Sequence, residues 1–106
     1  MKRGEVWWVE LDPTRGSEIR KTRPCIILSV DQVNRARKTV TVVPLSSAPR
    51  AYPPISTPVS VNGQPSIAKC DQMRAVDKSR LKSRLGALAP EHLGSVEEAI
   101  REVLGL

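Results

Sequence analysis

Short apolar runs separated by turn residues occupy most of this chain, and their lengths suit strands rather than long helices. The run Cys25–Val30 is almost wholly apolar and follows Pro24 directly, so we expect it to form a buried, central strand. Thr39–Val43 is rich in β-branched residues and predicts another strand. Because the chain has no Phe and only 3% aromatic residues, Val, Ile and Leu must fill its core.

The same patterns divide the 106 residues into short elements of one small domain, residues 1–106. The expected strands are Val6–Leu11, Cys25–Val30, Thr39–Val43, Ser56–Val61 and Ser66–Met73. Asp31–Lys38 is polar and can hold a helical turn, whereas Ala48–Pro58 contains four prolines and predicts a loop or a broken edge strand. Asn62-Gly63 is a turn signal between two of the strands.

Two helices are expected after these strands. Asp77 can cap a short helix that runs through Leu81. A longer helix begins at Pro90 and ends before Gly105, a natural residue for a helix C-terminus. Its apolar residues recur at helical spacing: Leu93, Val96, Ile100, Val103 and Leu104. The expected fold is therefore mainly β with α additions, a small barrel or sandwich that ends in a helix.

The formal net charge of +6 is unevenly distributed. From Pro90 onward one cation faces four carboxylates, a charge of −3, and the total therefore leaves +9 on residues 1–89. A basic body suggests an anionic partner, either a nucleic acid or an acidic peptide. A basic protein without such a partner has the same composition, so charge alone leaves both interpretations open.

Cys25 and Cys70 lie far apart in apolar runs, which predicts buried free thiols rather than a disulfide. Trp7 and Trp8 are adjacent on a strand, so we expect one to enter the core and the other to be more exposed. The chain contains no signal peptide, lipidation motif or apolar run of transmembrane length. We therefore expect a cytoplasmic protein with no membrane partner.

The segment Asp12–Cys25 holds a cluster of charges in a short stretch of chain. Four cations and one carboxylate fall between two hydrophobic runs: Arg15, Glu18, Arg20, Lys21 and Arg23. Asp12-Pro13 and Gly16 are turn signals, so we expect a loop here. Arg23 precedes Pro24 at the start of the buried strand, where its guanidinium can present a planar fork to a phosphate. A surface arginine paired with Glu18 or Asp12 is the alternative.

Other polar residues offer weaker candidates. Ser46 follows the strand at Val43-Pro44-Leu45, where its hydroxyl can donate to a phosphate oxygen; loop polarity is the alternative, and Ser47 is an equivalent neighbour. A second basic stretch is either a solvated face or an RNA contact: Arg74, Lys78, Arg80, Lys82 and Arg84. His92 is the only histidine, which excludes a two-histidine acid–base site. No residues have metal-ligand spacing, so we expect neither a metal nor a cofactor.

Six segments together resemble the MazF/PemK-type toxins, the ribonuclease halves of bacterial toxin–antitoxin pairs. They are Gly4–Val9, Asp12–Glu18, Arg23-Pro24, Val43–Ser47, Tyr52-Pro53 and Cys70–Asp77. They occur in order and with matching gaps, so the resemblance covers nearly the whole chain. It implies an SH3-like barrel with a C-terminal helix, assembled as a homodimer. It also implies an antitoxin partner that blocks the toxin through an acidic, largely disordered segment.

The resemblance implies a sequence-selective, metal-independent endoribonuclease that acts on single-stranded RNA. Arg23 falls on the family's catalytic arginine, and Glu18 on a carboxylate that orients it or assists proton transfer. Ser46 stands where the family usually has Thr, which retains the hydroxyl but loses the methyl that restricts χ1. We expect RNA contacts from Arg15, Arg20, Lys21, Ser47, Gln72 and Arg74.

Two other functions remain open on the same fold. One is a non-catalytic binding protein, like related toxins that inhibit DNA gyrase. The other is a degenerate toxin that folds and binds its antitoxin but does not cleave RNA, with Ser46 as the suspect position.

Overall fold

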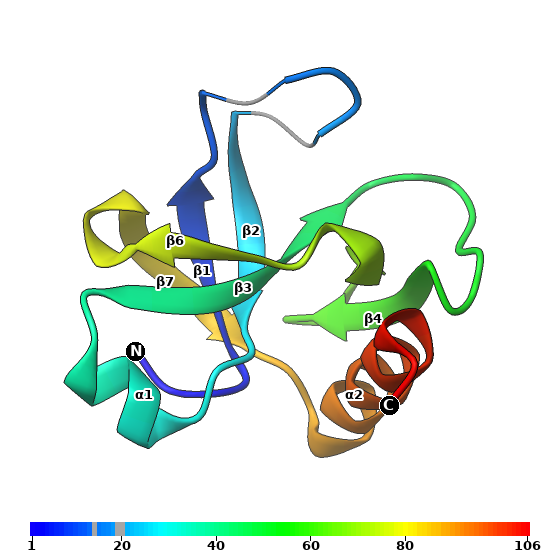
Figure 1. Ribbon diagram of the computed structural model, residues 1–106. Helices are drawn as coiled ribbons and strands as arrows, with labels where there is room; N and C mark the ends of the chain where they lie inside the picture. The colour runs from blue at the N-terminus through cyan, green and yellow to red at the C-terminus, as the bar shows by residue number, and fades with distance from the viewer. Residues whose placement is uncertain (14, 19–20) are drawn as a thin grey trace.

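The computed structural model describes residues 1–13, 15–18 and 21–106. Within these residues, seven strands form one antiparallel sheet that curls into a half-barrel (Figure 1). The elements in chain order are β1 (Glu5–Glu10), β2 (Thr22–Ile27), α1 (Asp31–Ala36), β3 (Thr39–Ser46), β4 (Ser56–Val61), β5 (Gln64–Lys69), the 3₁₀ turn η1 (Cys70–Gln72), β6 (Arg74–Asp77), the 3₁₀ turn η2 (Lys78–Arg80), β7 (Leu81–Ala87) and α2 (Pro90–Leu104). The expected class, mainly β with a C-terminal helix, is confirmed.

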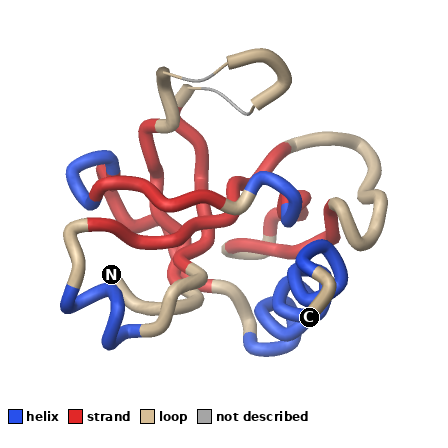
Figure 2. The backbone as a smooth tube through the Cα atoms, in the orientation of Figure 1, coloured by secondary structure: helices blue, strands red, loops and turns tan. Residues whose placement is uncertain are grey.

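β3 joins two groups of strands in the curled sheet, β4 and β5 on one side and β2, β1 and β7 on the other. The hydrogen-bonded order is β4-β5-β3-β2-β1-β7, and β6 pairs with the first half of β3. Val42, Val43 and Pro44 of β3 lie opposite β2, while Leu45 and Ser46 lie opposite β5. The strands occupy the centre of the molecule and the helical segments lie at its periphery (Figure 2). One strand therefore carries contacts to three others, so its end lies where the parts of the sheet meet.

Side chains alternate across the sheet and form two apolar clusters. The larger cluster includes Val6, Ile26 and Val43 and extends to the buried face of α2, which contacts β4. The smaller cluster contains Val9, Leu11, Cys25, Ile27, Val40, Val42 and Val76. Neighbouring residues of β2 thus contribute to different clusters, which fixes the face that each side chain occupies.

Several expected elements are confirmed. β1 lies where a strand was predicted, α1 occupies the expected helical turn, and α2 begins at Pro90. β3 begins at Thr39 as predicted but runs on to Ser46, so Ser46 lies within the strand and not after it, because its end pairs with β5. Asn62 and Gly63 have positive φ values of 52° and 77°, which is the geometry of a tight hairpin turn. Gly105 ends α2 with a φ of 72°. The predicted apolar face of α2 is wrong at one position, since Leu104 is half exposed.

The boundaries of the second strand were predicted wrongly. β2 begins at Thr22 and ends at Ile27, so Arg23 lies within the strand and not in the loop before it. Arg23 is paired with Val9 of β1. Pairing with the end of β1 therefore extends β2 toward the loop. The turn signals Asp12-Pro13 and Gly16 predicted a loop over the whole segment, and pairing with β1 extends the strand into its last residues.

The region after β5 also differs from the expectation. The strand expected over Ser66–Met73 ends at Lys69 and continues as η1. The short helix expected from Asp77 is only the 3₁₀ turn η2, in which the Asp77 carboxylate accepts from the Ser79 N–H at 2.9 Å. The expectation missed β6 and β7, because their mostly exposed, charged residues give little apolar periodicity and they form by pairing with β3 and β1.

Cysteine and tryptophan burial matches the expectation. Cys25 and Cys70 are buried and free. Burial raises the pKa of the Cys25 thiol to about 12, although the nearby Arg74 guanidinium acts in the opposite direction. Trp7 packs against the smaller cluster, whereas Trp8 is 37% exposed.

Within the described ranges, no helix has both the length and the apolar character needed to cross a membrane.

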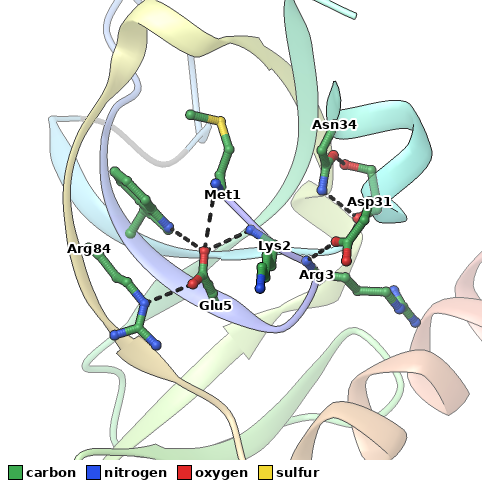
Figure 3. Close-up of polar contacts among 9 residues, drawn as sticks. Met1, Lys2, Arg3, Glu5, Asp31, Asn34 and Arg84 are labelled. Atoms are coloured by element: carbon green, nitrogen blue, oxygen red, sulfur yellow. Dashed lines mark hydrogen bonds and ion pairs between the residues drawn. The ribbon is translucent and has the colours of Figure 1, made fainter. Parts of the chain in front are cut away.

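The Glu5 carboxylate ties the N-terminal segment to the sheet (Figure 3). It accepts from the backbone N–H of Lys2 at 2.7 Å, from the Trp7 indole at 3.1 Å and from Arg84 of β7 at 2.9 Å. Partial burial by itself raises the pKa of Glu5, but these three hydrogen bonds and the N-terminal ammonium outweigh it, so the pKa is lowered. Glu5 therefore stabilises the fold as a carboxylate.

Replacing Glu5 by Gln should lower the free energy of unfolding by about 1–3 kcal/mol at neutral pH, because charge-assisted hydrogen bonds become neutral ones. Since the folded state lowers the pKa of Glu5, its contribution is complete above the ordinary value of 4.5 and is lost as pH falls through the lowered value. Urea unfolding at about pH 7 and about pH 3 should show the difference between variant and wild type shrinking in acid.

The matched control is Glu10→Gln on the same strand. Glu10 pairs with Lys82 at 3.4 Å with both side chains half exposed, so its replacement should cost less than about 1 kcal/mol. Equal losses for the two variants at neutral pH would contradict a special role for Glu5.

Candidate functional site

Arg23 of β2 and Ser46 of β3 line one pocket. The last residue pair between the two strands is Cys25–Pro44, and Arg23 and Ser46 each lie two residues beyond it. The pocket has a volume of about 150 Å³, and its lining residues are Arg23, Pro24, Leu45, Ser46, Ser47 and Ser66. The structure thus brings together Arg23, a partly buried residue, and three serines, residue types suited to binding a phosphate.

Hydrogen bonds hold two of the three serines of this pocket in place. The Ser46 hydroxyl oxygen accepts from the Ala48 N–H at 3.2 Å, and the Ser66 hydroxyl donates to the Ser46 carbonyl at 3.1 Å. Sequence reasoning missed Ser66, which lies on β5 and enters the site through the pairing of Ser46 with Ile67. No motif marks it, because its position depends on the register between two strands.

Glu18 lines a second, larger pocket of about 430 Å³. The pocket also contains Gln72 and Arg74, and its complete lining is Leu11, Ser17, Glu18, Pro44, Asp71, Gln72, Met73 and Arg74. The Glu18 carboxylate accepts from the Arg15 N–H at 2.7 Å, and the Glu18 N–H donates to the Arg15 carbonyl at 3.2 Å. Both bonds close a turn within the loop, so Glu18 fixes the local loop shape.

Two arginines of the second basic stretch anchor the base of this loop. Arg74 donates to the Leu11 carbonyl at 3.3 Å. Arg80 donates to the Glu10 carbonyl at 3.1 Å and to the Asp12 carbonyl. The Leu11 N–H in turn donates to the Lys21 carbonyl at 2.9 Å, across the point where the loop leaves and rejoins the sheet. These arginines therefore have a structural task, whatever else they bind.

The remaining candidates are distributed around these pockets. Arg15 and Lys21 are exposed on the loop, and Ser47 is exposed at the rim of the Arg23 pocket. Arg20 lies outside the described residues. His92 is structural, since its Nδ1 accepts from the Ser60 N–H at 3.3 Å.

Comparison with known proteins identifies relatives along the whole chain. A family model described as a PemK-like, MazF-like toxin of a type II toxin–antitoxin system matches residues 2–104. The chain is 33% identical to endoribonuclease MazF9 of Mycobacterium tuberculosis, with 100% of this chain and 98% of the relative aligned. It is 37% identical to endoribonuclease PemK of Escherichia coli, with 99% of this chain and 77% of the relative aligned.

A solved structure supports the fold. The crystal structure of MazF from Deinococcus radiodurans superposes with a TM-score of 0.89 at 23% identity, covering 100% of this chain and 97% of that chain.

Arg80→Ala should loosen the base of the loop, because the carbonyls of Glu10 and Asp12 lose a charged donor. We expect the backbone amide of Leu11 to exchange hydrogen about tenfold faster, measured by native-state hydrogen exchange. Lys82→Ala is the control, since Lys82 contacts the Glu10 side chain and not these carbonyls. The same exchange rate in both variants would contradict the anchoring role.

Proposed function

The chain belongs to the family of PemK-like, MazF-like toxins of type II toxin–antitoxin systems, and from this we propose that it is an endoribonuclease toxin. Relatives named as endoribonucleases align with almost all of it. The proposed reaction is sequence-selective, metal-independent cleavage of single-stranded RNA. The single observation that carries the proposal is the pocket shared by Arg23 and Ser46, the two residues expected to act on the scissile phosphate.

The chemistry requires no nucleophile from the protein. The ribose 2′-oxygen attacks the adjacent phosphorus and gives its proton to water, while the bond from phosphorus to the 5′-oxygen breaks and that oxygen takes a proton from water. The products are a 2′,3′-cyclic phosphate and a 5′-OH end. Arg23 neutralises the charge that develops on the phosphorane, and Ser46 donates a hydrogen bond to one of its oxygens. Alignment and charge stabilisation are the protein's contribution.

The hydroxyl of Ser46 is suited to this role without the methyl group of Thr. Its oxygen accepts from the Ala48 N–H, which restricts the side chain that Ser would otherwise leave free to rotate. Acceptance uses a lone pair, so the hydroxyl keeps its proton for the phosphate. This argues for an active toxin rather than a degenerate one.

Glu18 acts, in this proposal, by shaping the loop beside the catalytic pocket. Its carboxylate bonds the Arg15 N–H, and it lines a different pocket from Arg23. Arg15, Lys21, Gln72 and Arg74 border the path that the RNA follows toward Arg23 in this proposal. Arg20 is also expected to contact RNA, but it lies outside the described residues. Ser47 adds a polar contact at the rim of the catalytic pocket.

The partners follow from the family and the charge. A toxin of a type II system is paired with an antitoxin, and the +9 on residues 1–89 suits both RNA and an acidic, disordered antitoxin segment. We further propose that the toxin is a homodimer, and that it acts in the cytoplasm, where its RNA substrate is found.

Arg23→Ala should reduce cleavage by on the order of 10²–10³, because it removes a preorganised donor to the transition state. The assay incubates purified protein with a long single-stranded RNA in EDTA and maps the ends of the fragments, which should carry 5′-OH groups. Arg37→Ala, an exposed arginine after α1, is the control and should cleave like wild type. Circular dichroism checks that both variants fold.

Intact RNA with wild-type protein would refute the nuclease and favour the non-catalytic, gyrase-inhibitor-like alternative. Full activity in folded Arg23→Ala would refute the assignment of this arginine.

Two substitutions of Glu18 separate loop shape from proton transfer. Glu18→Gln keeps an oxygen that accepts from the Arg15 N–H, so it should retain activity within about fivefold, with an unchanged pH profile. Glu18→Ala loses that oxygen and should lose more than about tenfold. A large loss in Glu18→Gln, together with loss of the acidic limb of the pH–rate profile, would instead identify Glu18 as a general base.

A further inference from the structure

A third pocket adjoins the pocket of Arg23 and Ser46. Its volume is about 200 Å³, and its lining residues are Pro24, Leu45, Val61, Asn62, Gln64, Pro65, Ser66 and Leu85. Pro24, Leu45 and Ser66 line both pockets, so the two share a wall. A ligand bound at Arg23 and Ser46 therefore has this third pocket directly beside it.

The composition of the third pocket differs from that of its neighbour. All of its described lining residues are uncharged: five apolar side chains form its walls, and two side-chain amides, Asn62 and Gln64, stand at its edge with Ser66. Such a site does not favour a second phosphate or an acidic peptide, both of which need cations. It favours a flat group with apolar faces and hydrogen-bonding edges, which describes a nucleobase.

The fold holds Asn62 at the edge of this pocket. Asn62 opens the β4–β5 hairpin turn, and its Nδ2 donates to the Leu85 carbonyl of β7 at 3.0 Å. Gly86 leaves space for this contact, because a Cβ atom there would lie 2.6 Å from the Asn62 Oδ1. β7 thus fixes the turn, while Gln64 at the start of β5 is exposed and presents its amide beside the pocket.

We propose that this third pocket binds the base next to the scissile phosphate, and that Gln64 helps to select it. The apolar walls pack against the face of the base, and the amide of Gln64 supplies a donor and an acceptor to its edge. Asn62 acts as a positioning residue that holds the hairpin over the pocket. This inference rests on the proposed endoribonuclease function, and it assigns part of that enzyme's sequence selectivity to a specific surface.

The test compares cut-site profiles on one long single-stranded RNA. Gln64→Leu removes the amide but preserves the length of the side chain, so it should reduce the preference for one base beside the cut by about tenfold. Total cleavage at sites that lack this base should not fall. Gln32→Leu makes the same change on the exposed face of α1 and should keep the wild-type profile. Asn62 is left unchanged because its substitution also alters the turn.

The outcomes separate this inference from the function on which it rests. A wild-type profile in Gln64→Leu, or an equal fall at every site, would overturn the base pocket while leaving the nuclease intact. If wild-type protein cleaves no RNA, the nuclease proposal fails, and binding of 2′-O-methyl oligonucleotides that differ in one base then judges the pocket. The base pocket is supported if wild type and Gln32→Leu discriminate between the bases and Gln64→Leu does not. It is refuted if all three proteins discriminate equally.

Discussion

The antiparallel register between β2 and β3 is the constraint on which the site depends. Ile26 pairs with Val43 and Cys25 with Pro44, and these side chains belong to packed apolar surroundings on both faces of the sheet. Because side chains alternate along a strand, a slip of one residue would turn Arg23 away from its pocket and expose part of the core. Core packing therefore positions the guanidinium opposite the end of β3. Buried core residues that do not line the pocket thus determine the position of Arg23.

The basic charge of the protein serves more than one task. Arg74 and Arg80 hold backbone carbonyls at the base of the loop, and Arg84 bonds Glu5. Cations engaged with the chain still contribute to the long-range field that attracts an anionic ligand, but their donors are partly used. The net positive charge attracts any polyanion, so charge alone does not distinguish RNA from an acidic peptide. In the proposed function, the Arg23 pocket and the uncharged third pocket make that distinction, because they bind a phosphate and a base.

Sequence reasoning succeeded where a segment carries its own signal and failed where pairing supplies it. β3 is rich in β-branched residues, α2 has helical periodicity, and Asn62-Gly63 has clear turn chemistry, so these were predicted. β7 has mostly exposed residues, and it forms a strand because its backbone pairs with β1. Likewise, Arg23 and Ser46 were identified singly, but Ser66 and Gln64 join them only through the register of β5. Glu18 was expected to orient Arg23 or to assist proton transfer, and this stays a prediction; its carboxylate accepts from the Arg15 N–H, and it lines a different pocket from Arg23.

The pocket of Arg23 and Ser46 and the adjoining third pocket differ in how easily their residues can be substituted. Arg23 and Ser46 belong to strands whose register the core determines, so changes beneath them disturb both stability and chemistry. Gln64 is exposed at the start of β5, and substitutions at exposed positions usually cost less than about 0.5 kcal/mol. Because Pro24, Leu45 and Ser66 form the shared wall, the proposed base pocket keeps its place relative to the Arg23 pocket when Gln64 changes. In the proposed enzyme, the base that is selected can therefore change while Arg23 and Ser46 stay in place.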